Sequence, residues 1–201
     1  MPDRLHLSWT SWILLLLVAA GCGTSVEESI KQLASDDPEE RMDAAVALGE
    51  EGAVEAIDVL DERLAKDESP LVRSVCARAL SRLDRPACIP FLVRALEDRS
   101  PDVRREAVTG LGFLGARKAV ADLLPLLEKD RAPEVRRECA RVLGVLGSAE
   151  AVPVLIDALE DRDDSVRLHA EVSLRRLTCR DLGDDPRIWR DWLKDFRDRM
   201  E

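Results

Sequence analysis

The sequence contains no tyrosine, and aromatic residues make up only 3% of its 201 residues. Because β-sheets favour aromatic and β-branched side chains, this scarcity favours helices packed through alanine and leucine. Basic residues are also too few to balance the acids, and the formal net charge is -10 at pH 7. A general nucleic-acid-binding protein needs excess lysine and arginine to neutralise phosphates. The composition therefore favours an all-helical domain and argues against nucleic acid as the partner.

Residues that commonly form catalytic and metal sites are scarce as well. His169 is the one histidine beyond the N-terminal segment, and it occupies a variable position of the repeats described below. The cysteines after residue 22 lack the Cys-x-x-Cys and Cys/His spacings of zinc sites; they are Cys76, Cys88, Cys139 and Cys179. The sequence shows neither a glycine-rich phosphate loop nor a nucleophile elbow. We therefore predict no metal, no cofactor and no intrinsic catalysis.

The cysteines fall at positions that other repeats fill with alanine. Cys76 and Cys139 align with Ala44, Ala107 and Ala170, and Cys88 aligns with Ala56, Ala119 and Ala151. Free cysteine behaves as a small buried hydrophobe, which is the interpretation that we favour. A disulfide between Cys76 and Cys88 across one hairpin is the alternative, because exported proteins form disulfides.

The N-terminal apolar run is too short to cross a membrane. It comprises nine residues, Trp12–Ala20, whereas a spanning helix needs about 20. Nine apolar residues fit the core of a secretory signal. The run ends in small residues and a cysteine, Val18-Ala19-Ala20-Gly21-Cys22.

This ending resembles a bacterial lipoprotein signal, although Ala19 stands where that family prefers leucine. The resemblance implies cleavage before Cys22, diacylglycerol on its thiol and acylation of its amine. Several acyl chains give stable membrane anchoring. We expect residues 1–21 to be a signal peptide and residues 22–24 to be a lipidated cysteine with a short tether; ordinary secretion is the alternative. The expected location is the bacterial cell envelope, on the periplasmic face of the outer membrane if the organism has two membranes.

Arginines recur at a regular interval from residue 41 onward. Successive arginines are 32, 31, 32 and 31 residues apart, and a leucine seven residues after each one keeps the same steps. The arginines are Arg41, Arg73, Arg104, Arg136 and Arg167, and the leucines are Leu48, Leu80, Leu111, Leu143 and Leu174. A regular period over five copies is the signature of a repeat array.

Each repeat is predicted to be a hairpin of two helices. The first helix begins with a capping residue and a proline, as in Asp37-Pro38, Ser69-Pro70 and Ser100-Pro101. It ends near a residue suited to a left-handed backbone: Gly52, Gly115, Gly147 or, in the second unit, Asp84. A second apolar helix follows, and we expect the array to occupy residues 25–179.

The fifth unit has a first helix but no copy of the second. The segment Asp185–Phe196 is instead predicted to form an amphipathic helix with Trp189, Trp192, Leu193 and Phe196 on one face. We expect this capping segment, residues 180–201, to cover the end of the stack, because terminal repeats must shield the core. An exposed aromatic anchor for a partner is the alternative.

The repeat consensus resembles the short HEAT repeat, a type also found in phycobilin lyases. The shared pattern is Asp-x-x-Pro-x-Val-Arg-x-x-Ala-x-x-Leu in the first helix, followed by Ala-Val-Pro-x-Leu in the second. The resemblance implies an all-α, right-handed α-α superhelix (a HEAT-like solenoid) of about five 31–32-residue hairpins. It says much about architecture and little about function.

The resemblance also implies an Asp–Arg ladder, in which an aspartate lies six residues before each arginine. The matching residues are Asp67, Arg73, Asp98, Arg104, Asp130, Arg136, Asp161 and Arg167. The first unit departs from the pattern, since Ser35 stands where an aspartate should precede Arg41. An arginine fork can bridge carboxylates and loop carbonyls. We therefore interpret the ladder as a structural clip between repeats.

Acidic residues concentrate in the first repeat, where thirteen acids between Glu27 and Glu62 oppose two basic residues. A solvated outer face on a terminal repeat explains this excess, and a docking face for a basic partner is the alternative.

The second helices of a stack line an extended concave surface. The residues predicted to point outward there are Glu55, Asp58, Glu62, Arg94, Asp122, Glu150 and Asp157.

Two functions remain open at this point. We favour a membrane-anchored, non-catalytic scaffold that binds a protein with a basic or polar surface on the extracytoplasmic side. The alternative is a lyase-like protein that handles a tetrapyrrole (bilin), as the resemblance to phycobilin lyases implies.

Overall fold

The computed structural model describes residues 25–199, and within this range it contains eleven α-helices and no β-strand. The first helices of the hairpins, here called A helices, are α3 (Pro38–Glu51), α5 (Pro70–Arg82), α7 (Pro101–Phe113), α9 (Pro133–Leu146) and α11 (Asp164–Thr178). The second, or B, helices are α4 (Ile57–Lys66), α6 (Ile89–Ala95), α8 (Val120–Lys129) and α10 (Val152–Ala158). The predicted all-α HEAT-like solenoid is confirmed. Cys22 and the expected signal segment lie outside the described residues.

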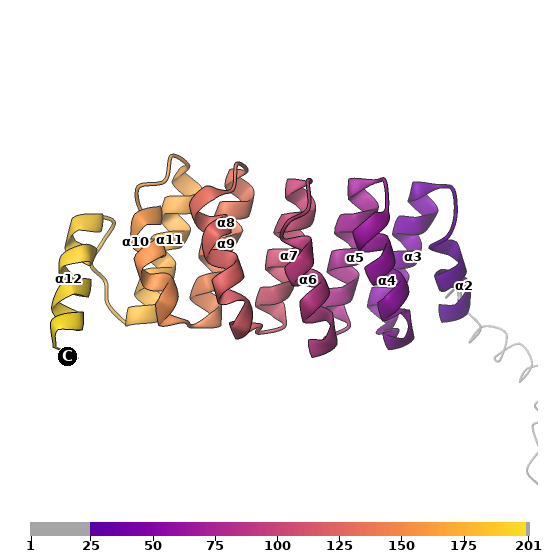
Figure 1. The fold of residues 1–201 in the computed structure, drawn as a ribbon, viewed down its shortest axis with the longest axis horizontal. Helices are drawn as coiled ribbons and strands as arrows, with labels where there is room; N and C mark the ends of the chain where they lie inside the picture. Colours follow the sequence, from indigo (N-terminus) through magenta and orange to yellow (C-terminus); the bar gives the residue numbers. More distant parts are fainter. Residues whose placement is uncertain (1–24, 200–201) are drawn as a thin grey trace, which may run out of the picture.

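The hairpins stack side by side into an elongated array (Figure 1). A helices contact the A helices of neighbouring repeats, as α3 contacts α5 and α9 contacts α11, and each B helix packs on the A helix that follows it. The short helix α2 (Val26–Gln32) precedes α3, and α12 (Pro186–Asp198) closes the other end. No helix among residues 25–199 is long and apolar enough to span a membrane.

The A helices begin and end at the residues that the sequence indicated. The Asp37 side chain accepts a hydrogen bond from the backbone N–H of Glu39 at the start of α3. Ser100 precedes α7 without such a bond; its own N–H donates to Asp98 instead. Helices α3 and α9 end at glycines with left-handed backbones, Gly52 and Gly147.

The core is a continuous stripe of repeat-equivalent aliphatic side chains. In the last four repeats the valine before the ladder arginine is fully buried, and in all five so is the leucine seven residues after it, as Val135 and Leu143 are in α9. Neighbouring A helices approach closely where Gly144 of α9 faces Ser173 of α11: a Cβ on Gly144 would lie 2.6 Å from the Ser173 Cβ. A side chain larger than hydrogen at position 144 would therefore push the last two A helices apart.

The C-terminal helix α12 packs against α10, and Figure 1 shows it at the end of the row of B helices. Trp189 is fully buried there, and its indole N–H donates to the Gly183 carbonyl at 2.8 Å. Arg190 binds Asp157 of α10 at 3.0 Å. Ile188 and Phe196 of the same helix stay 48% and 45% exposed, so α12 covers the last hairpin only in part.

Candidate functional site

Four arginines of the A helices form complete rungs of the Asp–Arg ladder. Each guanidinium donates two hydrogen bonds of 2.7–3.0 Å to one aspartate in the loop after the next B helix. The pairs are Arg41–Asp67, Arg73–Asp98, Arg104–Asp130 and Arg136–Asp161. Nη1 of the same arginine donates to a carbonyl of the preceding loop, as Arg73 does to Asp67 at 2.9 Å. Each rung therefore joins two successive inter-repeat loops.

The two ends of the ladder differ from the sequence prediction. Arg41 forms a full rung although its own repeat lacks the aspartate, because its bidentate partner Asp67 follows it in the chain; Ser35 contributes only a carbonyl, at 2.8 Å. Arg167 forms half a rung. It donates to the Asp161 carbonyl at 2.8 Å and pairs with Asp164 of its own helix. Within residues 25–199, α11 is followed by the connection 179–185 and not by a B helix with a ladder aspartate after it.

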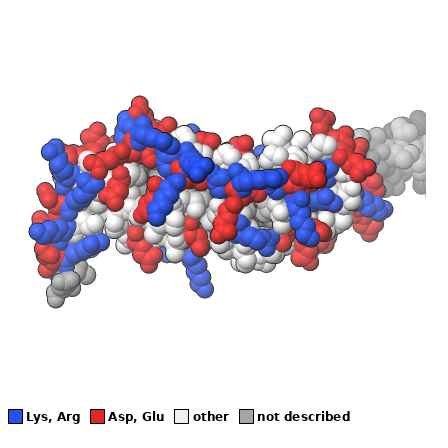
Figure 2. Space-filling view, turned by 45° about the horizontal axis from the view of Figure 1, so that its top comes forward, with Lys and Arg blue, Asp and Glu red and all other residues white. Residues whose placement is uncertain are grey.

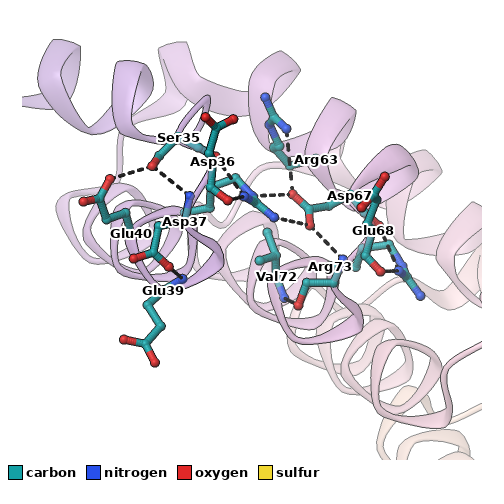
Figure 3. Close-up of polar contacts among 12 residues, drawn as sticks. Ser35, Asp36, Asp37, Glu39, Glu40, Arg63, Asp67, Glu68, Val72 and Arg73 are labelled. Carbon is teal, nitrogen blue, oxygen red and sulfur yellow. Dashed lines mark hydrogen bonds and ion pairs between the residues drawn. The ribbon is translucent and has the colours of Figure 1, made fainter.

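Three of the ladder carboxylates have pKa values below the ordinary value, which favours their ionised form. Burial opposes the charge on Asp130, but hydrogen bonds from Arg104 and from the Ala132 N–H outweigh it, so the pKa of Asp130 lies below its ordinary value. The pKa values of Asp98 and Asp161 are lowered in the same way. Figure 3 shows the first rung at Asp67, which Arg63 also approaches, at 3.8 Å. The buried groups are mutually neutralised, which is the behaviour of a structural clip.

The seven residues predicted to face a partner are all exposed. They form the B-helix face, defined as Glu55, Asp58, Glu62, Arg94, Asp122, Glu150 and Asp157. Three of them already have partners: Glu62 binds Lys66 at 3.1 Å, Arg94 pairs with Asp61, and Asp157 binds Arg190. The other four carboxylates form no ion pair with any residue from 25 to 199; they are Glu55, Asp58, Asp122 and Glu150.

Sequence reasoning missed two inter-repeat contacts on this face. Arg94 of α6 reaches back to Asp61 of α4 and lies with its guanidinium carbon 5.7 Å from the centre of the Phe91 ring. At the other end of the row, Arg190 binds Glu160 at 2.6 Å as well as Asp157. The equal separation of 33 residues within the Asp61–Arg94 and Asp157–Arg190 pairs could have indicated both contacts.

Figure 2 shows acidic and basic side chains lying beside one another along the top of the array, turned toward the viewer from Figure 1. The A helices lie on the side of the array opposite the B helices (Figure 1). The exposed apolar side chains of the A helices are Leu71, Phe113, Val145, Leu168 and Val172. Leu71, Phe113 and Val145 occur one to a helix, and Leu168 and Val172 lie one turn apart on α11. Small numbers of exposed apolar residues are ordinary on a protein surface. Phe113, which is 66% exposed, provides a reference position for testing which face binds a partner.

The described thiols and the histidine form no reactive cluster. Burial raises the pKa of the Cys76 thiol to about 12, and it also raises the pKa values of Cys88 and Cys139. These thiols are therefore protonated at neutral pH. Cys76 and Cys88 are both free. His169 Nδ1 lies 2.7 Å from the Ser165 carbonyl, and the residues from 25 to 199 contain no group of three or more acidic, His or Cys side chains placed to hold a metal.

A sequence profile of HEAT repeats matches three overlapping stretches of the chain, residues 12–81, 62–138 and 89–175. This chain belongs to the HEAT-repeat family. Within the described part, the matched stretches span every hairpin from α3 to α10, and this HEAT-repeat protein carries its ladder in the loops between them.

Two comparisons link the HEAT-repeat protein to enzymes. It is 43% identical over 74 residues to a deoxyhypusine hydroxylase of Coccidioides immitis (strain RS), a match that covers 36% of this chain and only 22% of that relative. Its fold resembles the complex of CpcE and CpcF of phycocyanin lyase from Nostoc sp. PCC7120, with a TM-score of 0.68, 25% identity, and coverage of 89% of this chain and 71% of that one. Human deoxyhypusine hydroxylase, at 20% identity and a TM-score of 0.54, shares the fold.

The prediction of a protein without enzymatic function is wrong in the light of these comparisons, because both relatives are named for enzymes. The prediction depended on the absence of contiguous catalytic motifs. In a stacked array, residues that act together come from separate repeats, so they need not form a motif along the chain. A motif search therefore had little power to exclude catalysis in this architecture.

Proposed function

We propose that this HEAT-repeat protein is the partner-binding chain of a lyase-type enzyme and is held at a bacterial envelope membrane by a lipid on Cys22. The observation that carries the proposal is the likeness to the phycocyanin lyase complex, which extends over 89% of this chain. That lyase is a complex of two proteins, CpcE and CpcF. A chain of the same architecture is suited to forming such a complex, in which its repeats bind a second protein.

The B-helix face supports the proposal through its charge. Glu55, Asp58, Asp122 and Glu150 present four exposed carboxylates, none of them paired within residues 25–199. Their positions extend from η1 (Val54–Ala56) to η4 (Ala149–Ala151), the short turns that begin the first and last B segments. The equivalent turn η3 (Arg117–Ala119) instead carries the basic residues Arg117 and Lys118, so the unpaired charge is mainly acidic. Unpaired carboxylates steer a partner of opposite charge and suppress wrong partners. The proposed partner therefore presents a basic surface.

The test is photo-crosslinking in cells from two matched positions of the full chain. A benzophenone amino acid replaces Ala121, which is exposed on α8 of the B-helix face, or Phe113, which is exposed on α7 of the opposite face. We expect one discrete crosslinked protein from position 121 and none from position 113. A crosslink from position 113 alone would contradict the assignment of the binding face. The mass of the mature N-terminal peptide tests the lipid, and a chain that keeps residues 1–21 would refute it.

A second candidate function is direct handling of a linear tetrapyrrole, and the likeness to phycocyanin lyase is the observation that favours it. The full chain is mixed with a bilin, and its visible absorption is recorded. Direct handling predicts a saturable shift of the absorption band. An unchanged spectrum eliminates this candidate and leaves the chain as the partner-binding component.

A further inference from the structure

Four A helices expose only arginine and apolar side chains over their last two turns. In the last eight residues of α5, α7, α9 and α11 (75–82, 106–113, 139–146 and 171–178), seven residues are exposed and none of them is acidic. They form the A-helix band, defined as Arg78, Arg82, Phe113, Arg141, Val145, Val172 and Arg176. In a chain with 40 acidic and 30 basic residues, a surface without an exposed carboxylate departs from the average composition.

The residues of the A-helix band lie in two neighbouring rows across helices that pack against one another in order. The row at the hairpin turns has equivalent positions on successive helices, 31 or 32 residues apart: Arg82, Phe113, Val145 and Arg176. The other three residues each lie one helical turn earlier. Arg82 binds Glu50, the equivalent residue of α3, at 3.1 Å, so side chains of this row reach from one helix to the next. The band is therefore one surface and not a set of separate points.

The carboxylates beside the A-helix band are already paired with arginines. The pairs are Glu106–Arg105, Glu138–Arg141 and Glu171–Arg175. Arg78 and Arg176 form no ion pair within residues 25–199. The hairpin turns that follow α5, α7 and α9 add three unpaired cations and two unpaired carboxylates, which are Arg85, Arg117, Lys118, Asp84 and Glu150. The uncompensated charge on this side of repeats two to five is therefore positive.

The first repeat has the opposite charge at the same positions. The last eight residues of α3 (44–51) expose only Glu50 and Glu51, and Glu50 is paired with Arg82. The A-helix band therefore begins at α5, and an anionic surface would contact the array from α5 onward.

An anionic bilayer suits the A-helix band better than a folded protein does. Protein partners are held by anchors that fill pockets, and the clefts lined by Leu64 and Ala95, by Leu127 and Ala158, and by Trp192 lie outside the band. Binding at a membrane surface instead combines basic side chains with exposed apolar ones and needs no pocket.

The proposed lipid on Cys22 also favours a bilayer as the occupant. Three residues separate Cys22 from α2, which begins after its cap Ser25, and they span about 11 Å at most. Some surface of the array would then lie close to the bilayer. At physiological ionic strength the acids of the first repeat are screened over about 8 Å, so this distance allows the first repeat to stay off an anionic surface.

We propose that the A-helix band docks on anionic phospholipid headgroups. Phe113 and Val145 lie at the boundary between headgroups and acyl chains, and Arg78 and Arg176 bind lipid phosphates. The B helices lie on the opposite side of the array (Figure 1), so docking leaves the B-helix face open to a protein partner. The choice of a bilayer rests on the proposed lipid anchor, and the docking itself is tested in a chain without that anchor.

The test uses the full chain with Cys22→Ala, which cannot be acylated at that position, and an environment-sensitive fluorescent amino acid. The fluorophore replaces Val145 in the A-helix band or Ala121, which is exposed on α8 of the B-helix face. Vesicles of phosphatidylglycerol mixed with phosphatidylcholine are compared with vesicles of phosphatidylcholine alone. We expect a saturable blue shift from position 145 with the anionic vesicles, weakening as salt is added, and none from position 121 or with the neutral vesicles.

Variants separate docking through the A-helix band from general adsorption. Arg78→Gln and Arg176→Gln each replace an exposed, unpaired side chain and are expected to weaken binding to anionic vesicles by about fivefold. Phe113→Ser is expected to weaken it by about tenfold at low and at high salt. Arg131→Gln, an exposed and equally unpaired arginine in the loop before α9, is expected to bind like the parent chain. Circular dichroism confirms that each variant is folded.

Three results would overturn the proposal: equal shifts from positions 145 and 121, equal binding to neutral vesicles, or unchanged binding in both arginine variants. Because the chain tested lacks Cys22, any of these results would leave the lipid anchor standing, and the mass of the mature N-terminal peptide tests that anchor separately.

Discussion

The interior of the array and its C-terminal junction use the same two residue types in different ways. Arg136 and Asp161 in the interior pair through two bonds of 2.7 Å, with side chains only 4% and 12% exposed. At the junction, Arg190 binds Asp157 and Glu160 with all three side chains well exposed. Buried bidentate pairs resist removal of one partner, whereas exposed pairs contribute little. Burial and bidentate geometry, rather than residue type, therefore determine whether an arginine–carboxylate pair is a structural clip or a weak surface contact.

The largest effect is expected from removing an interior arginine. Arg136→Ala leaves Asp161 partly buried without its counter-charge and removes the donor to the Asp130 carbonyl. Breaking such a pair lowers the free energy of unfolding by about 3–5 kcal/mol. Urea denaturation followed by circular dichroism measures the change. The matched control is Arg137→Ala, which removes the neighbouring arginine, forms no ion pair in residues 25–199, and is expected to stay within about 0.5 kcal/mol.

A smaller loss is expected where α9 and α11 approach closely at Gly144 and Ser173. Alanine favours a helix interior by roughly 1 kcal/mol over glycine, so propensity alone predicts that Gly144→Ala stabilises α9. The added Cβ would meet the Ser173 Cα at 3.0 Å, and such overpacking costs about 1–3 kcal/mol. We expect net destabilisation in thermal unfolding, and partial recovery when Ser173→Gly is added. Stabilisation by Gly144→Ala alone would show that the two helices separate freely.

Acid is expected to weaken the ladder in the interior of the array. The pKa values of Asp98, Asp130 and Asp161 are lower in the folded protein than in the unfolded chain, so their contribution is present above the ordinary value of 3.8 and is lost as the pH falls through and below it. The urea midpoint should therefore be level near neutral pH and drop below about pH 4. In Arg136→Ala the drop should be shallower, and an identical pH profile would indicate that other carboxylates control it.

The smallest effect is expected at the junction. Arg190→Ala removes two contacts between exposed side chains, while Trp189 remains buried and continues to hold α12. We expect no resolvable change in the urea midpoint, but faster amide hydrogen exchange across residues 186–198. If the midpoint instead dropped as far as in Arg136→Ala, the contrast between the two regions would be incorrect.

The fold could be predicted from sequence because its determinants recur every 31 or 32 residues. Proline-led starts, left-handed ends and buried leucines agree across the copies, and each local signal supports the others. The ladder aspartates could be found for the same reason. The spacing to a preceding aspartate does not predict a rung at Arg41, because its bidentate partner, Asp67, follows the arginine in the chain.

The candidate site was less predictable because its features occur once. The pairing of Arg190 with α10 depends on where the connection 179–185 places α12, and no periodicity specifies that path. Within residues 25–199, the buried indole N–H of Trp192 lacks an acceptor, which depends equally on packing between segments that are distant in sequence. Exposure of the B-helix face followed from helical periodicity, but which of its charges are already paired required coordinates.

The central claim is tested most directly by two variants, Asp122→Asn and Asp130→Asn. In each, the yield of partner crosslinking from position 121 is measured and divided by the amount of folded protein. Asp122 is an unpaired carboxylate of the B-helix face, and Asp130 is a ladder carboxylate held by Arg104. The account predicts that Asp122→Asn lowers the yield at unchanged stability, and that Asp130→Asn lowers stability at unchanged yield. The reverse pattern, with the yield lost only in Asp130→Asn, would contradict it.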